Sequence, residues 1–153
     1  MKKLSVIICC YNERATIRAV IDRTAAVDLG PNWSREIVVV DNFSTDGTRE
    51  ILQQIDHPEV RVIFHERNMG KGMSIRTGIA NMTGDYFIIQ DADAEYDPAD
   101  HVAFCRLADE TGAAAIFGSR VLGGHVRYKY AHAYLGVRVL TTMTNLLFGG
   151  HLT

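Results

Sequence analysis

The sequence predicts an α/β fold in which a mostly parallel sheet lies between layers of helices. Short, β-branched apolar runs alternate with stretches of helical periodicity from the first residues onward. This alternation is typical of strands that are joined by crossover helices. The 153 residues are 47% hydrophobic and 22% charged, so the chain can bury one ordinary core and is expected to form one domain.

The expected elements alternate along most of the chain. Strands are predicted at residues 4–9, 37–40, 60–64, 86–90 and 114–117. The stretches after the first three strands place apolar residues on one helical face: Ile17, Val20, Ile21 and Thr24, then Ile51, Leu52 and Ile55, then Ile75, Ile79 and Met82. Asn12 suits the cap of the first helix, Thr45 or Asp46 suits that of the second, and Pro98 fits the first turn of a fourth.

A last helical stretch, from about residue 131 to residue 148, is apolar on more than one face. It includes Val137, Leu140, Met143, Leu146, Leu147 and Phe148. Such a helix needs a covering surface, and the core, a second subunit or a membrane interface would each provide one.

Acidic residues follow the fourth expected strand at alternate positions. The apolar run 86–90 leads directly into Asp91, Asp93 and Glu95. Alternate side chains of an extended chain point to the same side. Carboxylate oxygens suit Mg²⁺ or Mn²⁺, with substrate phosphates completing the coordination shell. The alternative is an ordinary polar turn after a strand, and the rest of the sequence must decide between the two.

Other chemically suggestive residues also lie where expected strands end, which is where an open α/β sheet binds its ligand. They are Tyr11 and Glu13 after the first strand, Asp41 after the second, and the Gly-Ser-Arg sequence of 118–120 after the fifth. Asp41 can accept hydrogen bonds from a nucleotide base or ribose, while Lys71 and Arg76 can meet negative charge nearby. The alternatives are that Glu13 is a first-turn acid favoured by the helix dipole and that Lys71 is a solvated lysine.

The net charge of −2 says little about partners, and no nucleic-acid partner is expected, but the charges are unevenly distributed. No Asp or Glu occurs from Thr111 onward, whereas Arg120, Arg127, Lys129 and Arg138 all lie there. This predicts an anion-binding surface, with a plain solvated basic face as the alternative. No run approaches the roughly 20 apolar residues that span a bilayer, and the amino terminus is a poor signal peptide, so a cytosolic protein is expected.

Taken together, five segments resemble family 2 glycosyltransferases of the GT-A fold, a Rossmann-like three-layer sandwich. The segments are 6–13, 39–48, 68–72, 76–78 and 90–98. The Gly-Ser-Arg sequence at 118–120, the segment 145–149 and the final Leu-Thr are similar to the polyprenyl-phosphate (dolichol-phosphate) mannosyl- and glucosyltransferases. Two features depart from the family. Asn42 replaces the second acid of the usual Asp-Asp pair, and Cys9-Cys10 stands where a proline and a small residue are common.

The resemblance implies a role for each candidate residue. Nucleotide-sugar contacts would come from Tyr11, Glu13, Asp41, Lys71, Arg76 and Asp91; Mg²⁺ or Mn²⁺ would be held by Asp91, Asp93 and Glu95; the acceptor phosphate would be held by Arg120, Arg127 and Arg138; and Asp93 and Arg120 would be catalytic. The acceptor would be a polyprenyl phosphate at the membrane surface, which places the protein at the inner face of the membrane. A homodimer is left open. Because relatives continue past the final Leu-Thr, we expect 1–153 to be a single GT-A domain that is truncated at its carboxyl end.

The basic, acid-free carboxyl part favours a phosphate acceptor over a hydroxyl acceptor. A hydroxyl needs a general base, whereas a phosphate monoester, with a second pKa of about 6, is already a nucleophilic dianion at neutral pH. We therefore predict inverting, metal-dependent transfer from a UDP- or GDP-linked sugar to a polyprenyl or dolichyl phosphate. The alternatives are transfer to a sugar hydroxyl of a polysaccharide or glycolipid, a catalytically silent nucleotide-binding module, and a receiver domain, whose acidic pair would follow the first strand.

Overall fold

The computed structural model describes residues 1–93, 96–118 and 131–149. The chain divides into two compact units, Met1–Ala113 and Ala114–Thr153, and each is described by itself. Glu95, Arg120 and Arg127 lie outside the described residues.

The first unit is built on a sheet of four parallel strands. These are β1 (Lys2–Cys10), β2 (Trp33–Asp41), β3 (Val60–Phe64) and β4 (Tyr86–Asp91), in the order β3-β2-β1-β4. Val6 on β1 stands opposite Ile37 on β2 and Ile88 on β4, so β1 lies between these two strands. Strands β1 and β2 are the two inner strands, and β3 and β4 are the edges. The predicted parallel sheet is confirmed, with all four strands aligned and with β1 and β2 starting earlier than expected.

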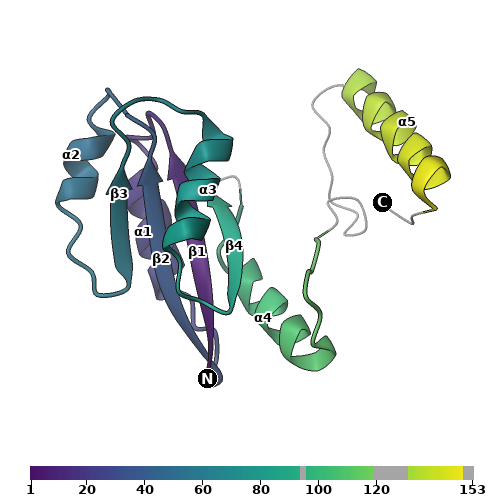
Figure 1. Ribbon diagram of the computed structural model, residues 1–153, viewed down its shortest axis with the longest axis horizontal. Helices are drawn as coiled ribbons and strands as arrows, with labels where there is room; N and C mark the ends of the chain where they lie inside the picture. The colour runs from purple at the N-terminus through teal and green to yellow at the C-terminus, as the bar shows by residue number, and fades with distance from the viewer. Residues whose placement is uncertain (94–95, 119–130, 150–153) are drawn as a thin grey trace. The chain divides into compact units, whose positions relative to one another are not determined.

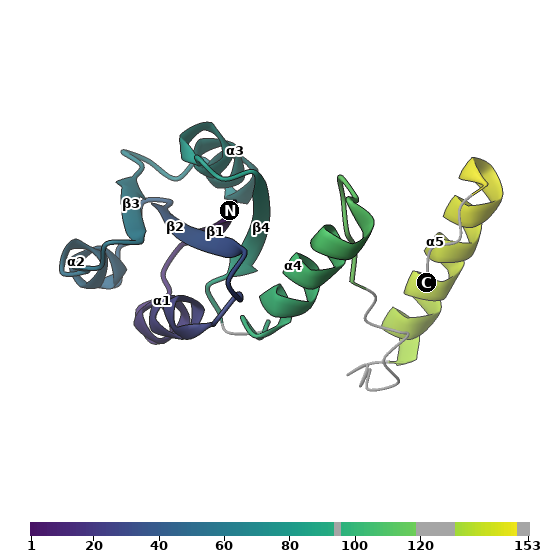
Figure 2. The same cartoon turned by 90° about the horizontal axis from the view of Figure 1, so that it is seen from below.

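Helices cover both faces of this sheet, which gives the expected three layers (Figures 1 and 2). Helix α3 (Lys71–Asn81) lies on one face, and α1 (Ile17–Ala26) lies on the other, with α2 (Thr48–Gln53) beside β3. Helix α4 (Asp100–Thr111) is tied to the starts of β1 and β2, because Asp109 accepts hydrogen bonds of 2.8 Å from Lys2 Nζ and from Trp33 Nε1.

The core fills the two spaces between sheet and helices. Its fully buried members include Ile7 and Ile8 from β1, Ile37 to Val40 from β2, and Ile17 and Ile21 from α1. Strands β1 and β2 are covered on both faces, and for that reason their sequences are continuous apolar runs rather than alternating ones.

Two helix starts differ from the predicted ones. Asn12 has a left-handed φ of 58° and lies in the loop before α1, which begins at Ile17. Asn tolerates this conformation better than most residues, so it serves the loop rather than the cap. Helix α2 begins at Thr48, after Gly47, and the Asp46 carboxylate accepts the Thr48 N–H at 3.0 Å. The N-cap is therefore Gly47 rather than Thr45 or Asp46, although Asp46 accepts the first helical N–H from one residue further out.

A partly buried acid joins β1, β2 and the segment before β4 at the end of the sheet where β1 begins. Glu36 on β2 accepts hydrogen bonds from Ser5 Oγ, from the Thr83 N–H and hydroxyl, and from the Gly84 N–H, and lies 3.5 Å from Lys3 Nζ. Burial opposes ionisation, but the hydrogen bonds from Ser5 and Thr83 and the charge of Lys3 lower the pKa of Glu36 to about 2.

Glu36 is expected to make the fold sensitive to acid. The pKa of Glu36 in the folded protein, about 2, is below the ordinary value of 4.5. Its contribution to the free energy of unfolding is therefore complete above pH 4.5 and is lost as the pH falls toward 2. We expect Glu36→Gln to lower the free energy of unfolding by about 2–3 kcal/mol at pH 7 and to flatten its pH dependence in that window. Urea unfolding at several pH values measures both. Glu110→Gln, at an exposed surface pair with Arg106, is the control and should change neither.

The second unit contains α5 (Ala131–Phe148). Leu140, Leu146 and Phe148 on this helix are exposed. No helix in the described ranges is long and apolar enough to cross a membrane.

The fifth strand predicted at 114–117 is not formed. Residues 113–118 have no regular structure, and Phe117 is 92% exposed. A strand needs a neighbouring ladder to satisfy its backbone groups, and the alanines of this segment have little intrinsic preference for a strand. The apolar run alone was therefore an insufficient signal.

Candidate functional site at the carboxyl edge of the sheet

A cavity of about 320 Å³ opens where the parallel strands end. It is lined by Cys9, Cys10, Tyr11 and Glu13 from the end of β1 and the loop after it, Asn42 after β2, Asn68, Gly70, Lys71 and Ser74 from the start of α3 and the loop before it, and Asp91, Ala92 and Asp93 from the end of β4. The segments that follow β1, β2 and β4 thus meet the start of α3 at one edge of the sheet, as the sequence predicts.

An acid and a lysine are paired inside this cavity. Asp91 is the last residue of β4, and its Oδ1 accepts a 2.6 Å bond from Lys71 Nζ at the first turn of α3. The hydrogen bond to Asp91 raises the pKa of Lys71. Asp93, two residues on, is exposed and lines the same cavity. The cavity lining therefore includes Lys71 together with two acids, Asp91 and Asp93, that are two residues apart in the chain, and Glu13 lines it as well.

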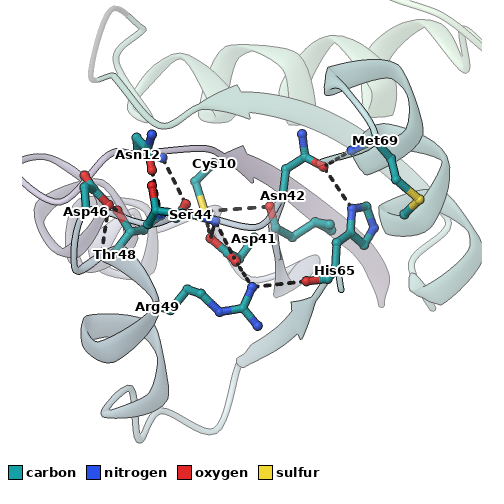
Figure 3. A network of polar contacts seen from close by, with 12 residues as sticks. Cys10, Asn12, Asp41, Asn42, Ser44, Asp46, Thr48, Arg49, His65 and Met69 are labelled. Atoms are coloured by element: carbon teal, nitrogen blue, oxygen red, sulfur yellow. Dashed lines mark hydrogen bonds and ion pairs between the residues drawn. The ribbon is translucent and has the colours of Figure 1, made fainter. Parts of the chain in front are cut away.

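Asn42 fixes the loop that carries the lysine (Figure 3). Its Oδ1 accepts the Met69 N–H at 2.9 Å, and its Nδ2 donates to Asn68 Oδ1 at 2.8 Å. His65 Nδ1 lies 3.1 Å from the same Oδ1. Because that oxygen already accepts from a backbone N–H, the His65 Nδ1 must carry the proton and donate it. The residue that departs from the family's Asp-Asp pair is thus a neutral anchor of the 68–70 loop.

Asp41 is not in the cavity. Its carboxylate is fully buried, pairs with Arg49 at 2.8 Å and accepts the Ser44 N–H at 3.3 Å (Figure 3). Arg49 also donates to the His65 carbonyl, and its guanidinium lies over the rings of Phe43 and Phe64. Through Arg49, Asp41 therefore holds the end of β2 to α2 and to the end of β3.

The loop after β1 is fastened to the loop after β2. The Asn12 N–H donates to Ser44 Oγ at 2.9 Å, and Asn12 Oδ1 accepts the Thr45 N–H at 2.8 Å (Figure 3). The Glu13 N–H donates to Thr48 Oγ1 at 2.9 Å. These bonds hold Tyr11 and Glu13 at the mouth of the cavity, where the Tyr11 side chain is half exposed.

The strand that carries the acids is supported from α4. Gln90, buried beside Asp91, donates to the Tyr96 carbonyl at 3.2 Å, and its Oε1 lies 3.2 Å from His101 Nε2. Burial and the charge of Arg35 lower the pKa of His101 to about 4, so the ring is neutral and donates through Nε2. Sequence patterns gave no sign of this pair, because its members come from different elements.

The cysteines of the cavity wall are unreactive. Burial raises the pKa of Cys9 to about 11 and raises that of Cys10 further. A thiol that stays protonated at neutral pH is a poor nucleophile and metal ligand. None of the three cysteines, all of which lie in the described residues, is part of a disulfide.

The structure brings together five of the predicted site residues, namely Tyr11, Glu13, Lys71, Asp91 and Asp93. Arg76 is exposed on α3 and does not line the cavity. Arg138 is exposed on α5, in the second unit. The side chains of Asn68 and Ser74 line the cavity without having been predicted to do so, although the polar and glycine-rich composition of 68–72 was a signal for that loop.

A parallel sheet whose carboxyl edge gathers acids and a lysine in one cavity is typical of α/β proteins that bind phosphorylated ligands. The model of one such family, Glycosyl transferase family 2, matches residues 5–152. The chain belongs to this family, as its motifs indicated.

Curated relatives and solved structures agree with this assignment. The undecaprenyl-phosphate 4-deoxy-4-formamido-L-arabinose transferase of Yersinia pestis is 33% identical over 113 residues, which is 72% of this chain and 35% of the relative. The mannosyltransferase PcManGT from Pyrobaculum calidifontis, solved with GDP-Man and Mn²⁺, has a TM-score of 0.60 and 32% identity over 71% of this chain and 33% of its own. S. aureus TarS 1-349, solved with UDP-GlcNAc, has a TM-score of 0.61 and 27% identity over 71% and 31%.

These comparisons confirm the predicted GT-A type of α/β fold and the resemblance to polyprenyl-phosphate sugar transferases. The chain spans about a third of the length of the curated relatives that it matches.

Proposed function

We propose that this protein takes part in the inverting, metal-dependent transfer of a sugar from a nucleoside diphosphate to a polyprenyl phosphate. One observation carries the proposal: Lys71, Asp91 and Asp93 line a single cavity with Tyr11 and Glu13. Membership of family 2 supports the reaction class, and the printed activity of the Yersinia relative supports the acceptor class. The solved neighbours were bound to GDP- and UDP-sugars, which supports a nucleotide donor of either kind.

The acids of the cavity fit a divalent cation. Asp91 and Asp93 offer carboxylate oxygens to the same space, and these are the ligands that Mg²⁺ and Mn²⁺ prefer. Among residues 1–93, 96–118 and 131–149, no group of three or more acidic, His or Cys side chains is arranged to hold an ion, so donor phosphates would complete the shell. When bound, the cation would neutralise the charge that develops on the leaving diphosphate.

The residues of the chain would divide the remaining tasks. Lys71 would meet phosphate charge from the side of α3, and Tyr11 and Glu13 would border the nucleoside at the cavity mouth. An acceptor phosphate oxygen would form a bond to the anomeric carbon while the bond from that carbon to the diphosphate breaks, and the electron pair would leave with the nucleoside diphosphate. No proton needs to be removed from the dianionic acceptor, and single displacement inverts the anomeric centre.

The arginines of the carboxyl part would hold the acceptor. Arg120, Arg127 and Arg138 are basic residues in a stretch without acids, and guanidinium groups bind phosphate through paired hydrogen bonds. A polyprenyl acceptor lies in a membrane, so the active protein would work at the inner membrane surface. The exposed apolar residues of α5 are of the kind that an interface or a second subunit covers.

Thermal unfolding with a panel of UDP-, GDP- and dTDP-sugars, each with and without Mn²⁺, tests the donor half of the proposal. A ligand stabilises the native state by RT ln(1 + [L]/Kd), so one nucleotide should raise the Tm, and Mn²⁺ should enlarge the rise. The absence of any nucleotide effect, with or without metal, would contradict the proposal.

Arg120→Ala is expected to separate the acceptor from the donor. In a form of the protein with measurable sugar-transfer activity, this change should lower the rate of transfer to polyprenyl phosphate by about a hundredfold. The affinity for the nucleotide sugar should stay nearly unchanged. Transfer of radiolabelled sugar to a short polyprenyl phosphate and calorimetric titration of the donor measure the two effects. Arg18→Ala, on the exposed surface of α1, is the control. Equal losses in both assays would assign Arg120 to the donor instead.

A further inference from the structure

The pair between Lys71 and Asp91 uses an oxygen that the proposed cation also needs. Lys71 Nζ lies 2.6 Å from Asp91 Oδ1, which is a short, charge-assisted hydrogen bond. The Asp91 side chain is 21% exposed, whereas that of Lys71 is 60% exposed. The acid is therefore part of the cavity wall, and the lysine reaches it from the solvent side.

The acid cannot easily move away from the lysine. Asp91 ends β4, where its Cα is paired with that of Cys9 on the central strand β1. Its neighbour Gln90 is buried and bonded to Tyr96 and near His101. A displacement of Asp91 would therefore break backbone pairing and a buried side-chain network.

The backbone of Lys71 is also held in place. The preceding loop is fixed because Asn68 Oδ1 accepts from both the Gly70 N–H and Asn42 Nδ2, and Asn42 accepts from the Met69 N–H. Beyond its Cα, however, Lys71 has four methylene groups and an exposed side chain. The ammonium group is accordingly the member of the pair that can change position.

We infer that the Lys71 ammonium and a divalent cation compete for the Asp91 carboxylate, so that the cation and a nucleoside diphosphate bind cooperatively. The inference rests on the proposed function. Two cations at one carboxylate repel each other, so a metal ion alone binds against Lys71. A diphosphate brings negative charge into the cavity that Lys71 lines, which gives the ammonium a new partner and leaves Asp91 to the ion. By linkage, each ligand then strengthens the other by the same factor.

Lys71→Met tests this competition, because it removes the charge and keeps most of the side-chain length. Mn²⁺ binding is measured by the EPR signal of the free ion, first without nucleotide and then with saturating UDP or GDP. Without nucleotide, we expect Lys71→Met to bind Mn²⁺ about tenfold more tightly than the unmodified protein, a typical size for coupled sites. With nucleotide, the gain in Mn²⁺ affinity should be several-fold smaller in the variant.

Two further variants exclude trivial explanations. Lys71→Arg keeps the positive charge and should retain weak Mn²⁺ binding without nucleotide. Lys2→Met removes another Lys–Asp pair, of 2.8 Å to Asp109, at the opposite ends of the strands, and should leave Mn²⁺ affinity unchanged.

The failures of the inference and of the proposed function are distinguishable. If Lys71→Met binds free Mn²⁺ no more tightly than the unmodified protein, or shows the same nucleotide-dependent gain, the competition is contradicted. If Mn²⁺ does not strengthen UDP or GDP binding by the unmodified protein, the metal dependence of the proposed function is contradicted, and the inference that rests on it fails as well.

Discussion

Asp93→Asn is expected to abolish the strengthening of nucleotide-sugar binding by Mn²⁺ while leaving the fold intact. Asp93 is exposed at the cavity, just beyond the last residue of β4, so the change should alter stability little. Under the proposed function, it would remove one of the carboxylate ligands of the cation where the diphosphate charge must be bridged. Nucleotide-sugar titration by calorimetry with and without Mn²⁺ measures the effect, and transfer in an active version should fall on the order of a hundredfold or more.

The matched control for this change is Asp22→Asn. Asp22 is an exposed acid of α1 that pairs with Arg18 at 3.0 Å, so the control alters the net charge equally but lies on a helix surface. It should leave the Mn²⁺ effect unchanged. If Asp93→Asn also retained the full Mn²⁺ effect, the ion would have to be held by other residues.

Gly78→Ala is expected to destabilise the first unit, although alanine favours helices. Gly78 is a buried residue of α3, and a Cβ there would overlap Cγ2 of Ile7 and lie 3.3 Å from its Cδ1. Ile7 is fully buried in the central strand and cannot give way. We expect a loss of about 1–3 kcal/mol in the free energy of unfolding, measured by urea denaturation, despite a gain of up to about 1 kcal/mol in helix propensity.

Two comparisons isolate the clash from other effects. Gly72→Ala lies in the same helix with nothing within 4 Å of the added Cβ, and it should raise stability by up to about 1 kcal/mol. In an Ile7→Ala background, which removes the overlapping methyl group, Gly78→Ala should cost much less than in the unmodified protein. Equal costs in the two backgrounds would show that the clash is not the cause.

The fold was predictable where local pattern and burial point the same way. The apolar runs of β1 and β2 and the predicted face of α1 are buried, so pattern and packing agree there. Strands β3 and β4 also form where predicted, although most of their residues are only partly buried or exposed. The predicted face of α3 is wrong, because its buried residues are Ser74 and Gly78 while Ile79 is exposed. At 114–117 the sequence is apolar, but the segment is not paired with another strand, and no strand forms. At Asn12 the residue type suited a cap, but bonds to Ser44 and Thr45 decided its role.

The location of the candidate site, at the carboxyl edge of the sheet, could be predicted from the sequence, but its side-chain contacts could not. The positions of Tyr11, Lys71 and Asp91 follow from the rule that strand ends meet. The burial of Asp41 does not, because it depends on Arg49 arriving from α2. The pairing of Lys71 with Asp91 likewise joins residues of different elements, 20 positions apart. Such contacts depend on side-chain placement in three dimensions, which periodicity does not encode.

The order of the strands has a consequence for the time course of folding. Contacts between β1 and β2 join residues about 31 positions apart, as from Ser5 to Glu36, whereas contacts at the start of β4 join residues about 82 apart, as from Lys3 to Asp85. The additional loop-closure entropy is only about 0.9 kcal/mol, but distant parallel pairings form slowly. We therefore expect β4 to join an already formed pair of strands. Asp91 would then reach Lys71 only in that late step, and a nucleotide could select only chains that have completed it.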